Sequence, residues 1–242
     1  MSYQIGHSDR GAHSHWLGPT EFGHRFRPVS VWDMIKSDAY SEDRIISILK
    51  DLSNRGFDPC AMDPWGNTTV LYEAICARRS KLVRFALSLI APERLKNHLD
   101  SKCGGEELSA LHVACAVRDL NAVQLLCEKG ASVSVKDRRG YSPVHLASLN
   151  GDVELLTILV GSLKGSDRLQ CLNDCVVTSE GLSALHLACM GGNLDAIHFL
   201  LANGAYVSVT DSSGRTPLEI AETEEDSEVV DAIRSFERRC GA

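Results

Sequence analysis

The sequence predicts an all-α repeat solenoid, in which helix–turn–helix units stack side by side with β-hairpin fingers between them. One hexapeptide pattern occurs five times, as TVLYEA (69–74), SALHVA (109–114), SPVHLA (142–147), SALHLA (183–188) and TPLEIA (216–221). These segments start 40, 33, 41 and 33 residues apart. The longer stretch 109–143 is identical to 183–217 at 17 of 35 positions without a gap. A catalytic loop rarely comes in duplicate, whereas a unit that must stack on its own copies does.

Each part of the repeated unit has a physical role. Ser142 can cap the first helix by accepting a hydrogen bond from a free N–H group, and Pro143 then takes the first helical position, where no N–H is needed. Gly130 ends the preceding second helix in a left-handed conformation. Val133 and Val135 alternate like a short strand before the turn sequence DRRG. One unit alone cannot bury its apolar faces, so the units are expected to form one continuous core.

The repeated unit resembles the ankyrin repeat, which has a period of about 33 residues and the motif T-P-L-H-x-A. The resemblance covers the chain from Ser41 to about Arg239. We interpret residues 1–29 as an N-terminal tail or arm and 30–62 as a degenerate N-terminal capping repeat. Five ankyrin repeats are expected over 63–239, at about 63–102, 103–136, 137–176, 177–210 and 211–239.

Repeats one and three are longer than the others by roughly seven residues, as the alternating spacing requires. Both insertions place an Arg-Leu pair, Arg94-Leu95 and Arg168-Leu169, fourteen residues before the leucine of LSALH. We infer that a block of two repeats, about 74 residues long, was duplicated.

Composition limits the class of protein. The chain has 242 residues, of which 44% are hydrophobic, and a net charge of −7 that disfavours nucleic-acid binding. No apolar run has the roughly 18 residues that a membrane helix needs, and the first residues have no secretory h-region. The nine cysteines are scattered, several of them inside helical apolar patterns, which is typical of reduced core thiols. We therefore expect an intracellular protein of the cytoplasm or nucleus, without membrane attachment.

Three histidines, His112, His145 and His186, recur at one position of the repeat. The resemblance implies a structural role, in which each bonds locally and to the neighbouring repeat. Stacked repeats lie roughly 10 Å apart, too far for three imidazoles to share one zinc ion. Cys171 and Cys175 lack the second close pair that a zinc site needs. No phosphate-binding loop, nucleophile elbow or zinc-protease motif is present, so we expect no cofactor, no metal and no enzymatic activity.

The resemblance implies a non-catalytic scaffold or adaptor for protein–protein interaction, binding its partner through the concave face of fingers and inner helices. Aromatic and arginine side chains are enriched at binding hot spots, and Trp65 and Tyr141 lie on turns where packing does not require them. The candidate partner-binding residues are Trp65, Arg118, Lys136, Arg138, Arg139, Tyr141, Leu149, Met190 and Arg215. Such a face would suit a partner segment that is acidic at one end and apolar in the middle.

Two alternatives remain open for the function. The chain could be an enzyme subunit or a regulatory inhibitor whose function lies in the N-terminal segment. Nucleic-acid binding through the arginines is disfavoured by the net charge. We expect a monomer or a subunit of a hetero-complex.

Overall fold

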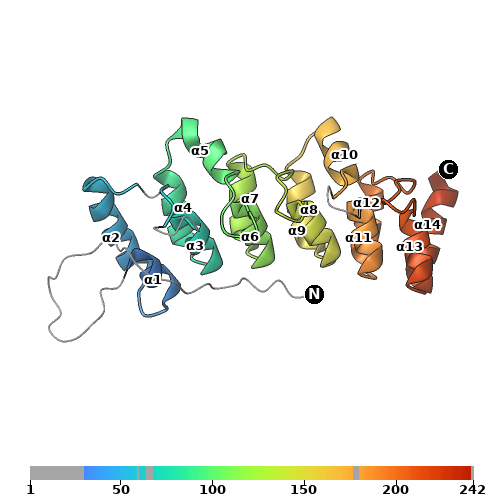
Figure 1. Ribbon diagram of the computed structural model, residues 1–242, viewed down its shortest axis with the longest axis horizontal. Helices are drawn as coiled ribbons and strands as arrows, with labels where there is room; N and C mark the ends of the chain where they lie inside the picture. The colour runs from blue at the N-terminus through green and yellow to red at the C-terminus, as the bar shows by residue number, and fades with distance from the viewer. Residues whose placement is uncertain (1–29, 59, 64–67, 177–179, 241–242) are drawn as a thin grey trace.

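The computed structural model describes residues 30–58, 60–63, 68–176 and 180–240. Antiparallel helix pairs stand side by side and form one elongated stack, which runs from α1 at one end to α14 at the other (Figure 1). The predicted all-α repeat stack is confirmed. In the described residues the six pairs are α1 (Val31–Lys36) with α2 (Glu42–Asn54), α3 (Val70–Cys76) with α4 (Ser80–Ser88), α6 (Ala110–Ala116) with α7 (Leu120–Glu128), α8 (Pro143–Leu149) with α9 (Val153–Gly161), α11 (Ala184–Met190) with α12 (Leu194–Ala202), and α13 (Pro217–Thr223) with α14 (Ser227–Cys240).

The repeated hydroxyl residue begins the first helix of each pair, as predicted. In α8 the Ser142 hydroxyl accepts a hydrogen bond from the His145 N–H, while the His145 side chain accepts one from the Ser142 N–H. This reciprocal capping box satisfies two backbone donors that a helix start leaves free. Pro143 and Pro217 occupy the first helical turn of α8 and α13, where a missing N–H costs nothing.

Glycines end the second helices in the left-handed region. Gly130 follows α7 with φ of 87° and Gly204 follows α12 with φ of 96°. A side chain at such a φ is strained, so glycine is the residue that turns the chain there at least cost. Both positions confirm the helix ends that the sequence predicts.

The fingers between the pairs are turns with isolated bridges, such as Cys103–Leu108, and the described residues contain no extended strand. The expectation that Val133 and Val135 form a short strand is wrong. The Ser132 hydroxyl accepts a hydrogen bond from the Ser134 N–H at 3.3 Å, which holds the backbone in a turn instead of a ladder.

The two insertions form additional helices, α5 (Pro92–Leu99) and α10 (Ser166–Asn173), which begin at equivalent positions of the two blocks. Both lie along the upper edge of the stack in Figure 1, after the outer helices α4 and α9. At the end of each insertion an oxygen of Asp100 or Asn173 accepts a hydrogen bond from the next unit, from the N–H of Ser132 at 2.8 Å and of Tyr206 at 2.7 Å. The recurrence of the helix is what duplication of a two-repeat block would produce, whereas the two contacts are made from adjacent and not equivalent positions.

Arg79 joins the first helix pair to the rest of the stack. Its guanidinium donates hydrogen bonds to the carbonyl oxygens of Ile35 at 2.8 Å, Ser37 at 2.6 Å and Tyr40 at 2.9 Å. These carbonyls lie at and beyond the end of α1, where a helix leaves acceptors free. In return the Glu42 carboxylate accepts from the N–H of Leu82 at 2.8 Å in the first turn of α4.

The core is mainly aliphatic, with Trp32 and Tyr72 as aromatic members, and it is continuous from α1 to α14. Leu111 and Leu185, at equivalent places in α6 and α11, have no exposed surface. In α14 Val229 and Ile233 are buried while most of the remaining surface is charged, as the polar outer face of an end unit needs to be. Among the described residues, no helix is long and apolar enough to cross a membrane.

Candidate protein-binding surface

Each of the three recurring histidines connects its own helix cap to the next unit. The Nε2 atoms of His112, His145 and His186 lie 3.0, 3.0 and 3.1 Å from the carbonyl oxygens of the residues 29 positions later. A carbonyl only accepts, so each Nε2 carries the proton and each Nδ1 accepts from the cap serine. Burial lowers the pKa of His145 to about 4 and also lowers the pKa of the other two rings. The rings are therefore neutral at neutral pH.

The described residues contain no group of three or more metal-ligating side chains close enough to hold a metal ion. Cys171 is buried in α10 and Cys175 is half-buried beyond its end. Burial raises the pKa of the Cys171 thiol to about 11 and that of Cys189 to about 12, so both thiols are protonated at neutral pH. A protonated thiol is a poor nucleophile, and these cysteines fill space in the core.

The predicted fingertip cations contact acceptors of the same chain. The Lys136 ammonium lies 2.9 Å from the Asp174 carboxylate, and the Arg139 guanidinium lies 3.5 Å from that of Glu106. Arg138 donates through its side chain to the carbonyl oxygen of Gly105 at 3.2 Å. These three cations thus lie on one finger, where Lys136 and Arg139 pair with the chain's own acids and Arg138 with a carbonyl oxygen.

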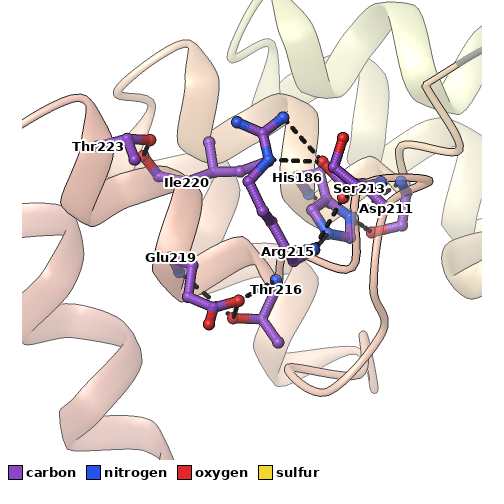
Figure 2. A network of polar contacts seen from close by, with 9 residues as sticks. His186, Asp211, Ser213, Arg215, Thr216, Glu219, Ile220 and Thr223 are labelled. Carbon is purple, nitrogen blue, oxygen red and sulfur yellow. Dashed lines mark hydrogen bonds and ion pairs between the residues drawn. The ribbon is translucent and has the colours of Figure 1, made fainter.

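Arg215 lies in the last described finger, in the polar network that Figure 2 shows. Its Nε and NH2 atoms lie 2.9 and 2.8 Å from Oδ2 of Asp211, and its carbonyl oxygen accepts from His186. The other Asp211 oxygen accepts from the N–H groups of Ser213 and Arg215, both at 2.8 Å. Glu219 replaces the recurring histidine and accepts from the Thr216 N–H at 2.7 Å, so the cap survives the substitution. The network fixes the finger while the arginine side chain remains exposed.

The expectation that packing does not require Tyr141 is wrong. Its side chain is half-buried against the core, and its ring meets the His145 ring edge-on at 6.4 Å between centroids. The Tyr141 carbonyl also accepts the hydrogen bond from His112. This aromatic residue therefore stabilises the stack in addition to any part in binding. Trp65 lies outside the described residues.

The remaining candidates lie at the turn between the first helix of their unit, the inner one, and the second helix, the outer one. Arg118 is exposed, and its Nε lies 2.5 Å from the Asp152 carboxylate. Leu149 and Met190 are the last residues of α8 and α11, half-buried and 44% exposed respectively. The structure therefore divides the candidates into a fingertip group and a turn group.

Sequence reasoning missed two exposed apolar side chains, one in α10 and one beside it. Leu169 is 41% exposed and Tyr206 is 52% exposed. Asn173 of α10 connects them, because its amide bonds both the Leu169 carbonyl and the Tyr206 N–H. The equivalent residues of the first block are Leu95 and Ser132, both half-buried. In the sequence, the change from Ser132 to Tyr206 at one repeat position could have indicated this exposed apolar pair.

These features define the class of protein: a stack of capped helix pairs joined by histidine and finger contacts, with its variable side chains at fingertips and turns. A family model described as ankyrin repeats in three copies matches residues 38–137, 89–168 and 144–238. The chain belongs to the ankyrin-repeat family. Ankyrin repeats are protein-interaction modules, and the fold is generally non-catalytic.

Curated relatives share part of their length with this chain. The nuclear factor NF-kappa-B p105 subunit of Gallus gallus is 31% identical over 157 residues, which are 64% of this chain and 15% of that protein. A putative palmitoyltransferase, ZDHHC13 of Danio rerio, is 27% identical over 222 residues, 80% of this chain and 33% of that protein. The chain thus spans a third or less of either relative.

Among solved structures, the ankyrin repeat domain of Bcl-3, described as a unique member of the IkappaB protein family, superimposes with a TM-score of 0.66. It is 28% identical and covers 78% of this chain and 77% of its own. The similarity supports a protein-binding role.

Proposed function

We propose that the chain is a non-catalytic scaffold or adaptor that binds a partner protein through its fingertips and inner-helix turns. It is organised as a degenerate capping repeat, 30–62, followed by five repeats over 63–239. The proposal assigns no catalytic residue to the chain. The similarity to a putative palmitoyltransferase gives no reason to assign that activity to this chain, because the match covers only 33% of that protein.

The observation that carries the proposal is a contrast between two equivalent fingers. Asp137 and Asp211 occupy the same position in the two blocks, and each accepts hydrogen bonds from the N–H groups two and four residues further on. Each finger also donates to the preceding one, through the N–H of Arg138 to Glu106 and of Ser212 to Glu180, both at 2.9 Å. The framework is thus the same in both blocks.

The outward side chains of these two fingers differ. Arg138 and Arg139 stand in the first block where Ser212 and Ser213 stand in the second. All four are exposed, so the core does not dictate them. A constant framework with changing outward chemistry is typical of a recognition surface, and repeat stacks use extended surfaces of this kind for binding.

The test compares the two equivalent fingers. After a partner is identified by affinity purification of the full chain, the double variant Arg138→Glu with Arg139→Glu should slow its association and reduce the salt dependence of the rate. The matched control is Ser212→Glu with Ser213→Glu, which adds two acids to the same framework. Equal slowing by both variants, or by neither, would contradict the fingertip assignment.

A further inference from the structure

One backbone position recurs in the turn between the inner and outer helix of every repeat. Its residue has a left-handed φ of 53° at Arg78, 53° at Arg118, 69° at Gly151, 62° at Gly192 and 57° at Glu225. From the first repeat to the last, this position therefore reads Arg, Arg, Gly, Gly, Glu. We call the row of turns 76–79, 116–119, 149–152, 190–193 and 223–226 the turn edge. It lies on the lower side of the stack in Figure 1, opposite α5 and α10.

The cations at the start of the turn edge contact acceptors within the chain. The Arg118 guanidinium pairs with Asp152, and that of Arg78 donates to the carbonyl oxygen of Val117 in the next turn. Both side chains point along the stack, toward the following unit. Their donors are therefore partly used before any partner arrives.

The acids at the other end carry charge that the chain does not balance. In the described part of the chain, no hydrogen bond or ion pair reaches the carboxylates of Asp195, Glu224, Glu225 and Glu228, and all four are exposed. Glu222 differs from them, because its carboxylate lies 2.6 Å from the Arg234 guanidinium. The turn edge thus ends in a region of negative potential.

Two apolar side chains, Met190 and Leu149, lie beside this acidic region. Met190 is 44% exposed at the end of α11, and the neighbouring turn contains half-buried Leu149. The side-chain amide of Asn193 donates to the Leu149 carbonyl at 3.1 Å, which joins the two turns directly. Gly151, Gly191 and Gly192 add no side chains to this part of the edge, and Met190 is accessible. Methionine adapts its shape to different apolar partners.

Combining charge and apolar surface, we infer that the turn edge of the last three repeats binds a protein segment in which a large apolar residue adjoins lysine or arginine. The apolar side chain contacts Met190 and Leu149, and the cations face Glu224 and Glu225. The apolar contact retains the segment, while the charges speed and orient its docking. This inference rests on the proposed function and adds a cationic segment at the turn edge to the acidic segment expected at the fingertips.

The experiment selects peptides from a random phage-displayed library on the full chain. We expect enriched peptides to combine a large apolar residue with adjoining lysines or arginines. A synthetic copy of the most enriched peptide, followed by fluorescence anisotropy, should bind about tenfold more weakly to Met190→Asp and to Glu224→Lys with Glu225→Lys, as hot-spot changes do. Raising the salt concentration should weaken its binding to the unmodified chain.

Matched controls lie on the opposite edge of the stack. Leu169→Asp changes an apolar side chain that is 41% exposed, and Glu93→Lys with Asp167→Lys reverses two exposed acids of α5 and α10. Both controls should retain peptide binding within about twofold, since they leave the turn edge intact. Melting curves of all variants check that each stack is folded.

Other outcomes overturn the inference. Enrichment of acidic peptides would do so, as would equal loss of binding in the Leu169→Asp control. Peptides that depend on Arg138 and Arg139 but not on Met190 would overturn it and leave the proposed function standing. If neither a peptide nor a partner protein bound to the fingers or to the turns, both this inference and the proposed function would be wrong.

Discussion

The Nε2–H of His145 donates a hydrogen bond to the carbonyl oxygen of Asp174 at 3.0 Å, across the boundary between two repeats. At the same time Nδ1 of the ring lies 2.7 Å from the Ser142 hydroxyl, so both nitrogens are engaged. The Ser142 N–H also donates to Nδ1 at 3.2 Å, so the ring makes all its contacts only as the neutral tautomer, because protonation of Nδ1 would remove this acceptor. One side chain therefore couples the start of a helix to the stacking of the next unit.

Because of this histidine, the stability of the protein should fall as the pH is lowered. Burial lowers the pKa of His145 from 6.5 to about 4 in the folded protein. Between these values the unfolded chain binds more protons than the folded one, so acid favours unfolding. The contribution of His145 to the free energy of unfolding is fully present above about pH 6.5. At pH 4 the free energy of unfolding is lower by about 3 kcal/mol. Urea unfolding measured at several pH values checks this.

The matched variant for this prediction is His145→Gln. Glutamine at this position can keep the capping box, as Glu219 does in the last repeat, but it does not titrate. The variant should be less stable at pH 7 and should show a shallower decline toward pH 4. An unchanged slope would assign the acid sensitivity to other groups.

Truncating a core leucine should loosen the stack locally. Leu185 has no exposed surface, and Leu185→Ala should cost about 2–5 kcal/mol of unfolding free energy. Leu169→Ala, at a 41% exposed position, should cost less than about 0.5 kcal/mol. Because repeats couple to their nearest neighbours, hydrogen exchange in Leu185→Ala should rise first in α11 to α14. Uniform loosening of all helices would contradict a stack with nearest-neighbour coupling.

Arg79 gives a prediction for the first helix pair. Arg79→Ala removes hydrogen bonds to three carbonyl oxygens near the end of α1 and should destabilise that pair by roughly 3 kcal/mol. Hydrogen exchange should increase in α1 and α2, while α6 to α14 keep their protection. Arg84→Ala is the control, because Arg84 is exposed on α4, the helix that directly follows Arg79. Equal effects of the two variants would mean that the three hydrogen bonds are not the cause.

Local patterns predicted the helices, their caps and their glycine ends, because those features depend on residues within four positions of one another. Ser142 with His145 is such a pair. The resemblance implied the histidine contacts between repeats, but the charge contacts between repeats depend on the stacking geometry and were not predicted. Lys136 meets Asp174 and Arg139 meets Glu106, although the members of each pair belong to different repeats. The expectation of a partner segment that is acidic at one end therefore took no account of these ion pairs within the chain.

The turns of the third and fourth repeats supply the last prediction, which concerns Gly151. A Cβ atom placed on Gly151 would lie 2.4 Å from Oδ1 of Asn193, the residue whose amide bonds the Leu149 carbonyl. Gly151→Ala should therefore incur the strain of a left-handed φ and also displace Asn193. Gly130 is the control, since its φ is 87° and a Cβ there would meet nothing within 4 Å. The strain alone costs about 1 kcal/mol, and the lost hydrogen bond adds about 1 kcal/mol to Gly151→Ala only.

A double-mutant cycle separates these two contributions. In an Asn193→Gly background neither the amide nor the Asn193 Cβ, which would lie 3.0 Å from the new Cβ, remains, so Gly151→Ala should cost only what Gly130→Ala costs. The free energies come from urea unfolding of the four proteins in the cycle together with the Gly130→Ala control. If Gly151→Ala remained about 1 kcal/mol more costly than Gly130→Ala without the Asn193 amide, the contact between these turns would not be the reason for glycine at 151. If the difference disappeared, the close approach of Asn193 would account for it.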